Sequence, residues 1–575
     1  MTVASTHLAE PSFLELFTPK LVTIMREHYG FRDFKADVIA GLTVAIVALP
    51  LSMAIAIASG VTPDRGLYTA IIGGFCVSAL GGSRFQIGGP AGAFIVLVAA
   101  TVQQHGLDGL LLATLVSGLM LLAIGLLRLG TFIKYIPYPV TVGFTAGIAI
   151  IIFASQIKDV LGLTLEGQEP GPIVPKLIAL GHALPSLNVA ALSVAVATIV
   201  IILTLRRFGP HWPGLLIAVA FASLAGWMFG LPVETIGTRF GGIPHALPTP
   251  ALPAFSVDKI SAVLPSALSF ALLGGIESLL SAVVADSMTG RRHRSNCELA
   301  AQGVANIASS LFGGICVTGT IARTATNVRA GARSPIAGML HSLFLLLFML
   351  VAAPLASFIP LAALAGVLAV VAWNMVEKHA FATLLRASRG DAVVLLATFL
   401  LVVFRDLTEG ILVGFGIGAL LFLHRMAQAV DVESGLPLVR EDGADSEATR
   451  TAYDSSVATD RDVIVLRISG AFFFGAAGSV GAALDRIAER PKIYILDFSA
   501  VPMLDSTAGT TIAAFVQKAN RSGIDVLISG ADKSVRHSLL QHRVRRPFAR
   551  FMPSLEAAVA AAREKLGERQ RLRFQ

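Results

Sequence analysis

The 575-residue chain contains few charged residues and only three cysteines. Charged residues make up 14% of the chain and apolar residues 54%, and the mean hydropathy is +0.74. A soluble protein this apolar has too little polar surface to cover its exterior, so the sequence predicts a membrane protein. Cys76, Cys297 and Cys316 lie far apart, in or beside apolar stretches, which indicates small hydrophobic side chains and predicts no metal site.

Other classes of function lack their motifs. The chain has no Gly-Lys-Ser or Gly-Lys-Thr, which argues against a self-contained ATP-driven pump. It shows no nucleophile–base constellation, so the sequence predicts neither an enzyme nor a cofactor. The net charge of +8 comes from short basic clusters between apolar runs, without the interleaved aromatic residues of a nucleic-acid-binding surface. Glu10 and Glu15 precede the first apolar run, so no cleavable signal peptide is expected.

Apolar runs long enough to cross a bilayer recur along the first three quarters of the chain. They lie near residues 38–58, 66–80, 88–102, 107–127, 136–157, 189–205, 213–231, 261–286, 298–315, 320–331, 335–358, 361–376, 391–404 and 408–424. This even count of fourteen places both termini on one side of the membrane. With the N-terminus inside, the inner connections hold 18 Lys and Arg residues and the outer ones 6. The excess predicts an inner-membrane protein with both termini in the cytoplasm.

The character of the sequence changes after Arg425. Residues 431–460 are polar and without periodicity, which is typical of a linker. Beyond them, strand-length apolar runs at 463–469, 492–498 and 525–529 alternate with amphipathic stretches near 476–490, 505–520 and 554–566. This alternation predicts a small α/β domain. The predicted organisation is therefore a cytoplasmic segment 1–37, a transport domain 38–430, a linker 431–460 and a cytoplasmic domain 461–575.

Two of the fourteen spans are unusually short, and a glycine-rich stretch introduces each of them. These stretches cover residues 80–94 and 311–324, before the third and tenth spans, the same position in two sets of seven. Because seven is odd, the second set is inserted upside down, which predicts an inverted repeat with its binding site at broken helices. Opposed helix N-termini at the membrane midplane would bind an anion without a buried formal charge. The alternative is that these glycines only permit close helix packing.

Three polar residues in these spans are candidates for transport chemistry. Glu277 has apolar neighbours in the eighth span, and burial favours the neutral form of a carboxyl, so it is a candidate proton carrier. Ser281 lies four residues on and shares its helix face. Arg323, in the first turn of the tenth span, is a candidate anion ligand. The alternatives are a helix–helix hydrogen bond for Glu277 and a structural ion pair between Glu277 and Arg323.

Three segments resemble the sulfate permease (SulP) family, also called solute carrier family 26. They are Pro63–Thr69, Gly89–Phe94 and Glu298–Asn306, and the resemblance extends over nearly the whole chain. It implies an all-α membrane domain of fourteen segments in a seven-plus-seven inverted repeat with core and gate subdomains. It also implies a homodimer that moves small anions by shifting the core against the gate.

The resemblance also implies which residues bind substrate and coupling ion. The family's third-span and tenth-span sites fall on Gly89, Pro90, Ala91, Gly92, Ala93, Phe94, Gly319, Thr320, Ile321, Ala322 and Arg323. Sodium-coupled bicarbonate carriers of the family place Asp where Glu277 stands and Thr where Ser281 stands. A longer carboxylate would crowd a sodium site, which favours proton coupling through Glu277 and Ser281. Animal members often carry serine at the position of Ala322, so one hydroxyl contact is lost here.

The tail resembles the STAS domain (sulfate transporter and anti-sigma antagonist). Its segment Leu504–Gly509 matches the antagonist motif, in which the residue after Asp is phosphorylated. The resemblance therefore implies Ser506 as a regulatory phosphosite and a cytoplasmic partner for this domain. The alternative is that Asp505 and Ser506 only cap the following helix.

The sequence thus predicts a secondary active transporter of small anions of the sulfate, bicarbonate or dicarboxylate class. Proton-coupled symport and anion exchange both fit, with the lipid bilayer as surroundings and no nucleic acid as partner. Three alternatives remain: a sodium-coupled bicarbonate transporter, an uncoupled anion channel of the same fold, and a nucleobase carrier built on a similar inverted repeat. Arg323 with two helix N-termini suits an anion better than a nucleobase.

Overall fold

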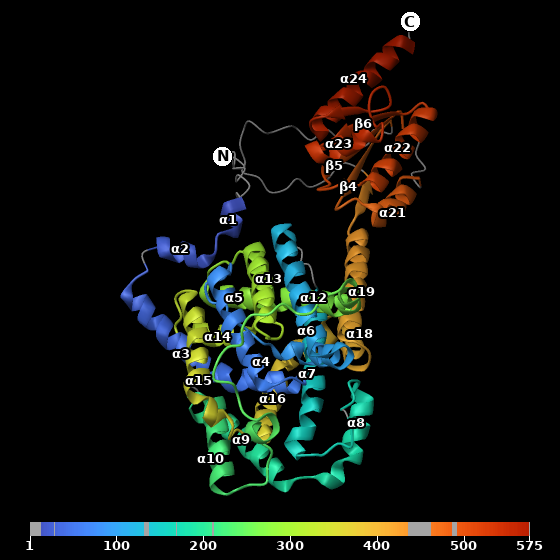
Figure 1. Ribbon diagram of the computed structural model, residues 1–575. Coiled ribbons are helices and arrows are strands. Elements are labelled where there is room, and N and C mark those ends of the chain that lie inside the picture. The colour runs from blue at the N-terminus through green and yellow to red at the C-terminus, as the bar shows by residue number, and fades with distance from the viewer. Residues whose placement is uncertain are drawn as a thin grey trace. The chain divides into compact units, whose positions relative to one another are not determined.

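The computed structural model describes residues 13–27, 29–130, 137–167, 169–209, 212–434, 462–485 and 491–573. The chain divides into two compact units, Met1–Gly416 and Ile417–Gln575. Figure 1 shows the first unit as a helical body and the second as a sheet flanked by helices.

Unit 1 consists almost entirely of helices. Its α-helices are α1 (Phe13–Phe17), α2 (Lys20–Arg26), α3 (Phe31–Ala58), α4 (Pro63–Tyr68), α5 (Gly74–Leu80), α6 (Ile95–Leu126), α7 (Tyr138–Leu161), α8 (Ile173–His182), α9 (Val189–Phe208), α10 (Gly214–Met228), α11 (Ile236–Phe240), α12 (Val257–Thr289), α13 (Ser295–Leu311), α14 (Ile321–Arg329), α15 (Ile336–Ala356), α16 (Leu361–Met375), α17 (Lys378–Ala387), α18 (Arg389–Phe404) and the start of α19 (Leu407–Gln428). A π-helical turn (Thr69–Gly73) joins α4 to α5, and 3-10 turns lie at Gly92–Phe94 and Leu184–Ser186.

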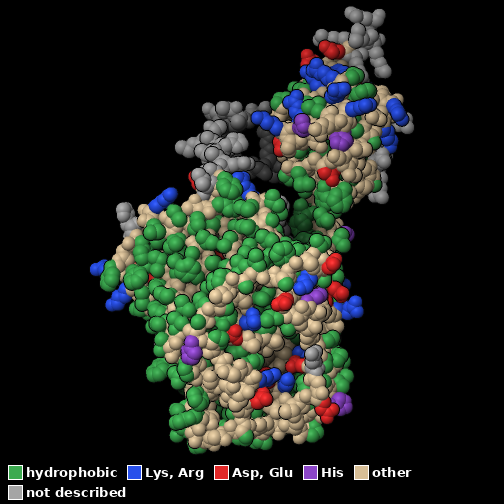
Figure 2. Space-filling model, in the orientation of Figure 1, with side chains coloured by type: hydrophobic (Ala, Val, Ile, Leu, Met, Phe, Trp, Pro, Cys, Tyr) green, Lys and Arg blue, Asp and Glu red, His purple; other side chains and the backbone are tan. Residues whose placement is uncertain are grey.

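Each of the fourteen predicted apolar runs contains helix in the structure, although the run 88–102 begins with a short strand and a 3-10 turn before α6. Eight helices of the described residues are long and apolar enough to span a membrane. The third and fourth predicted spans share α6 and meet at Gly106, whose φ of 68° interrupts the helix, a conformation that favours glycine. On the face shown in Figure 2, hydrophobic side chains cover much of this unit's surface, as expected for contact with lipid.

Two short β-strands pair with each other inside unit 1. β1 (Gly88–Gly89) pairs antiparallel with β2 (Thr318–Gly319), with Gly88 opposite Gly319 and Gly89 opposite Thr318. All four residues are buried. Because β1 leads toward α6 and β2 toward α14, the antiparallel pairing brings the starts of two helices together from opposite directions.

Unit 2 contains a five-stranded mixed sheet in the order β3 (Asp431–Ser434), β4 (Val463–Ser469), β5 (Ile493–Ala500), β6 (Asp525–Ser529) and β7 (Arg550–Met552). β3 is antiparallel to β4, and the remaining neighbours are parallel. One hydrophobic core joins the sheet to α21 (Phe474–Asp485), α22 (Ser506–Arg521) and α23 (Lys533–Gln541). A second core joins the other face to α24 (Leu555–Arg573).

The three predicted strands are therefore confirmed as β4, β5 and β6. The first four residues of the predicted linker form β3, and residues 435–461 lie outside the described residues.

Candidate functional site

The site begins with the backbone crossing of β1 and β2. Beyond the strand pair, the Thr320 N–H donates to the Ile87 carbonyl at 2.9 Å, and the Ile87 N–H donates to the Thr324 hydroxyl at 3.1 Å. Glycine on both strands leaves room for side chains from elsewhere, because a Cβ on Gly89 would displace the Arg323 guanidinium and a Cβ on Gly319 would displace the Gln86 side chain. The crossing therefore fixes residues that lie more than two hundred positions apart in the sequence.

The helix that follows β2 begins with uncapped amide groups. Thr320 is the N-cap of α14, yet its hydroxyl donates to the Ile87 carbonyl at 3.2 Å, and no side chain caps the helix start. The 3-10 turn Gly92–Phe94 that precedes α6 likewise has no side-chain cap. Such N–H groups carry partial positive charge and are suited to an anion.

Arg323 is the cation of the site. Its side chain is 2% exposed, and Nη2 donates to the Ser52 hydroxyl and to the Pro90 carbonyl, both at 3.2 Å. Nε and Nη1 are buried without a hydrogen-bond partner in the described part of the chain. No ion pair joins Arg323 to Glu277 among the described residues, so the structural ion pair considered from the sequence is not formed there. A buried guanidinium with free donors is an electrostatic site for an anion.

The predicted third-span residues divide by environment. Gly89, Pro90, Ala91, Ala93 and Phe94 are buried, whereas Gly92 is partly exposed. The Phe94 ring lies 6.0 Å from the ring of Phe270 on α12, at a tilt of 57°. Phe94 therefore packs against α12.

In the tenth span, Gly319, Thr320 and Arg323 are buried, whereas Ile321 and Ala322 are exposed. The first turn of α14 thus presents Ile321, at 41% exposure, and Ala322 away from the crossing. Arg323 lies on the opposite face, toward Ser52 and Pro90.

Glu277 and Ser281 lie on α12 but differ in their contacts. Ser281 is fully buried and donates to the Thr324 hydroxyl at 3.0 Å, which connects it to the helix α14 that carries Arg323. Glu277 is partly buried, and its Oε2 is buried without a hydrogen-bond partner in the described residues. The helix–helix hydrogen bond considered for Glu277 is therefore not made by that oxygen.

The sequence reasoning missed several polar residues around the crossing. Gln86 donates from Nε2 to the Ser278 hydroxyl at 2.8 Å, and Thr324 accepts from two directions. His341 of α15 is fully buried, and neither of its ring nitrogens has a hydrogen-bond partner among the described residues. Gln86 and Thr324 belong to the glycine-rich stretches, so their place there was a usable signal, whereas nothing in the sequence points from Ser52 or His341 to Arg323.

A small substitution at the crossing tests how closely Arg323 is held. We expect Gly89→Ala to displace the guanidinium, at a cost of about 1–3 kcal/mol for overpacking, and to weaken anion binding. Equilibrium binding of anion to the purified chain measures this loss of affinity. Gly416→Ala is the control, because a Cβ there meets no atom within 4 Å. Equal affinities in both variants would contradict the tight contact between Gly89 and Arg323.

In unit 2, Asp505 rather than Ser506 caps α22. Its carboxylate accepts from the Ala508 N–H and from the Phe474 N–H, both at 2.9 Å, whereas Ser506 is the exposed first residue of the helix. We expect Asp505→Ala to destabilise α22 by about 1–2 kcal/mol, and Ser506→Ala by less than about 0.5 kcal/mol. Hydrogen exchange of the α22 amides in the full chain measures both. Equal exchange in the two variants would contradict the assignment of the cap to Asp505.

Comparison with known proteins relates this arrangement to a family. The model of the "Sulfate permease family" matches residues 34–398, more than half of the chain. The chain belongs to the sulfate permease family. A STAS domain model matches residues 454–558.

Sulfate permease relatives match most of the chain. The "Putative sulfate transporter YvdB" of Bacillus subtilis is 41% identical over 506 residues, covering 87% of this chain and 92% of that protein. The "Bicarbonate transporter BicA" of Synechocystis sp. is 31% identical over 539 residues, covering 91% of this chain and 92% of that protein.

Solved structures agree with the family. The transmembrane domain of a cyanobacterial bicarbonate transporter BicA superposes with a TM-score of 0.59 at 32% identity, covering 68% of this chain and 98% of that one. The murine Solute Carrier 26 family member A9, an anion transporter in the inward-facing state, superposes with a TM-score of 0.83 at 19% identity, covering 98% and 97%. The latter establishes the shared fold: a helical membrane domain followed by a STAS domain.

Proposed function

We propose that this protein is a secondary active transporter of small anions of the sulfate, bicarbonate or dicarboxylate class. The observation that carries the proposal is the buried Arg323, whose Nε and Nη1 donors have no protein partner among the described residues. It lies beside the helix starts at Gly92–Phe94 and Ile321. The relatives named as sulfate and bicarbonate transporters support the substrate class. In this proposal Gly89–Phe94 and Gly319–Arg323 surround the anion.

We further propose that a proton drives transport through Glu277. Its buried Oε2 has no hydrogen-bond partner in the described residues, and an ionised carboxylate in that setting is costly. Protonation removes that cost, so a proton can bind there reversibly as the surroundings change. The Ser281–Thr324 hydrogen bond connects the same helix to α14, which carries Arg323. Proton-coupled symport or anion exchange then proceeds by movement of the core against the gate.

The proposal extends to the arrangement of the whole protein. The transport domain covers residues 38–430 and the STAS domain residues 461–575. Of the linker 431–460 between them, residues 431–434 form β3 of the sheet. The protein resides in the inner membrane as a homodimer with both termini in the cytoplasm. Phosphorylation of the exposed Ser506 at the start of α22 would place negative charge at a helix N-terminus, where it is favourable, and would change the surface offered to a cytoplasmic partner.

Transport by the purified full chain in liposomes tests the function. Uptake of labelled sulfate, bicarbonate, chloride, fumarate and succinate is measured with and without sodium and with and without a pH gradient. We expect one class of anion to enter, to be driven by an acid exterior without sodium, and to show trans-stimulated counterflow. Sodium dependence would favour a sodium-coupled bicarbonate transporter, and uptake without trans-stimulation would favour a channel. No uptake of any of the five anions would contradict the proposal.

A further inference from the structure

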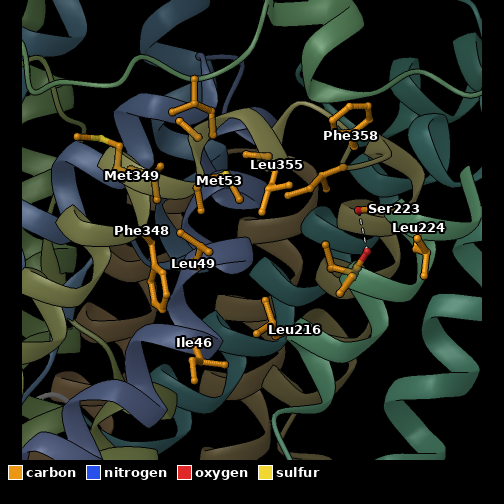
Figure 3. Close-up of a pocket in the computed structure, with 18 of the residues that line it drawn as sticks. Ile46, Leu49, Met53, Leu216, Ser223, Leu224, Phe348, Met349, Leu355 and Phe358 are labelled. Atoms are coloured by element: carbon orange, nitrogen blue, oxygen red, sulfur yellow. Dashed lines mark hydrogen bonds between the residues drawn. The ribbon is translucent and has the colours of Figure 1, made fainter. Parts of the chain in front are cut away.

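Unit 1 contains a cavity of about 630 Å³ that is separate from the candidate anion site. Its walls come from the C-terminal half of α3, from α10 and from the C-terminal half of α15 (Figure 3). Leu49, Met53, Leu216 and Phe348 are among the side chains that line it. None of the predicted anion-binding or coupling residues lies in the wall, so the cavity is not part of the candidate anion site.

The lining offers almost no polar group. Among the lining residues, only Ser223 and Trp227 carry a polar side-chain group. The Ser223 hydroxyl donates to the Val219 carbonyl of its own helix at 2.8 Å, and the Trp227 indole N–H belongs to an exposed side chain at the rim. Figure 3 shows this bond as a dashed line. A water molecule in a protein interior needs two to four polar partners, and an anion needs donors. The chemistry of the wall therefore selects an apolar occupant.

The rim of the cavity lies on the exposed surface of unit 1. Trp227, Leu355 and Phe358 are 66%, 70% and 47% exposed, although each also contributes to the wall. Trp227 and Leu355 lie in the last turns of α10 and α15, and a tryptophan at the end of an apolar helix is typical of a membrane–water interface. An occupant can therefore enter from the bilayer while a polar end stays at the interface.

The volume of the cavity fits a long hydrocarbon chain rather than a small solute. An apolar protein cavity of about 150 Å³ holds a benzene-sized ligand, and this one is roughly four times larger. Left empty, such a volume deprives its lining side chains of dispersion contacts. The most abundant apolar molecule at the rim is the hydrocarbon tail of a membrane lipid.

We propose that this cavity binds one acyl chain of a phospholipid, whose head group remains at the membrane interface. This proposal does not rest on the proposed function. The acyl chain packs between α10 on one side and α3 and α15 on the other. It supplies apolar contacts to the side chains of these helices that line the cavity.

Native mass spectrometry of the purified full chain tests the proposal. We expect the wild-type chain to keep one phospholipid after the detergent has been removed by collisional activation. Ala220→Phe, on α10, places a ring in the cavity and is expected to lose that phospholipid. Val351→Phe on α15 is the matched control, because Val351 is 72% exposed and does not line the cavity. If Ala220→Phe fails to fold, Ala352→Phe fills the cavity from α15.

Retention of the phospholipid in Val351→Phe with its loss in a filled variant supports the site. Equal retention in wild type and a folded filled variant would overturn it. So would a wild-type chain without a retained phospholipid, one that carries detergent in its place, or equal loss in Val351→Phe.

Discussion

Replacing Arg323 by alanine is expected to weaken anion binding by at least about 30-fold and to abolish measurable uptake. The guanidinium is 2% exposed and has two donors without a protein partner in the described residues. Losing one partner of a desolvated charged contact costs about 2–5 kcal/mol, and about 1.4 kcal/mol corresponds to tenfold in affinity. Equilibrium binding and liposome uptake of the anion identified by the uptake panel measure the two effects.

Two further variants separate charge from packing. Arg329→Ala removes an exposed arginine at the other end of α14 and is expected to leave binding unchanged. Arg323→Lys keeps the charge but loses the planar guanidinium, in which Nη2 donates to both Ser52 and Pro90 while Nε and Nη1 remain for an anion, so an intermediate affinity is expected. Unchanged affinity in Arg323→Ala would limit Arg323 to a packing role and remove it from the anion site.

The second large effect concerns the coupling of anion uptake to a proton gradient. Glu277→Gln is expected to abolish the dependence of uptake on a pH gradient while anion exchange continues. A gradient of about one pH unit supplies about 1.4 kcal/mol for each coupled proton, enough for about tenfold accumulation of anion. Glutamine keeps the size of the side chain but carries no titratable proton, so accumulation should fall to none. Anion uptake by liposomes, measured with equal and with different pH values inside and outside, gives this accumulation.

Asp258→Asn provides the control for this experiment. Asp258 is an exposed carboxylate in the first turn of α12, the same helix that carries Glu277. We expect the Asp258→Asn variant to accumulate as much anion as the wild type. Acid-driven accumulation that persists in full in Glu277→Gln would exclude Glu277 as the coupling residue.

Much of the membrane architecture follows from local properties of the sequence. A long apolar run has to form a helix in lipid, because its backbone groups find no other partners there, and all fourteen runs contain helix. The glycine-rich stretches 80–94 and 311–324 are also local signals. Their matched positions predicted helix starts that meet from opposite sides, and the antiparallel pairing of β1 with β2 brings them together.

The partners of individual side chains were not predictable in the same way. Arg323 reaches the Ser52 hydroxyl, 271 positions earlier in the chain, and no periodicity in α3 marks Ser52 as a ligand. The same holds for His341, whose burial depends on the packing of α15 against α3. Tertiary contacts of this kind arise from the assembled fold.

In unit 2, the elements that sequence reasoning missed are weak in local signal. β7 has three residues and β3 four, and pairing with neighbouring strands is what defines them. Helix α23 has nine residues and follows a polar N-cap, Asp532, whose carboxylate accepts from the Val535 N–H at 2.7 Å. The three predicted strands, by contrast, are mostly apolar and mostly buried, and they lie in the centre of the sheet.

The central claim is that an anion binds where the helix starts of the third and tenth spans meet beside Arg323. Anomalous diffraction from crystals of the full chain grown with selenate, and separately with bromide, tests it most directly. We expect an anomalous peak within hydrogen-bonding distance of Arg323 Nη1 or Nε, between the turn Gly92–Phe94 and the first turn of α14. Ordered peaks from both anions elsewhere in the membrane unit, with none at Arg323, would contradict the claim.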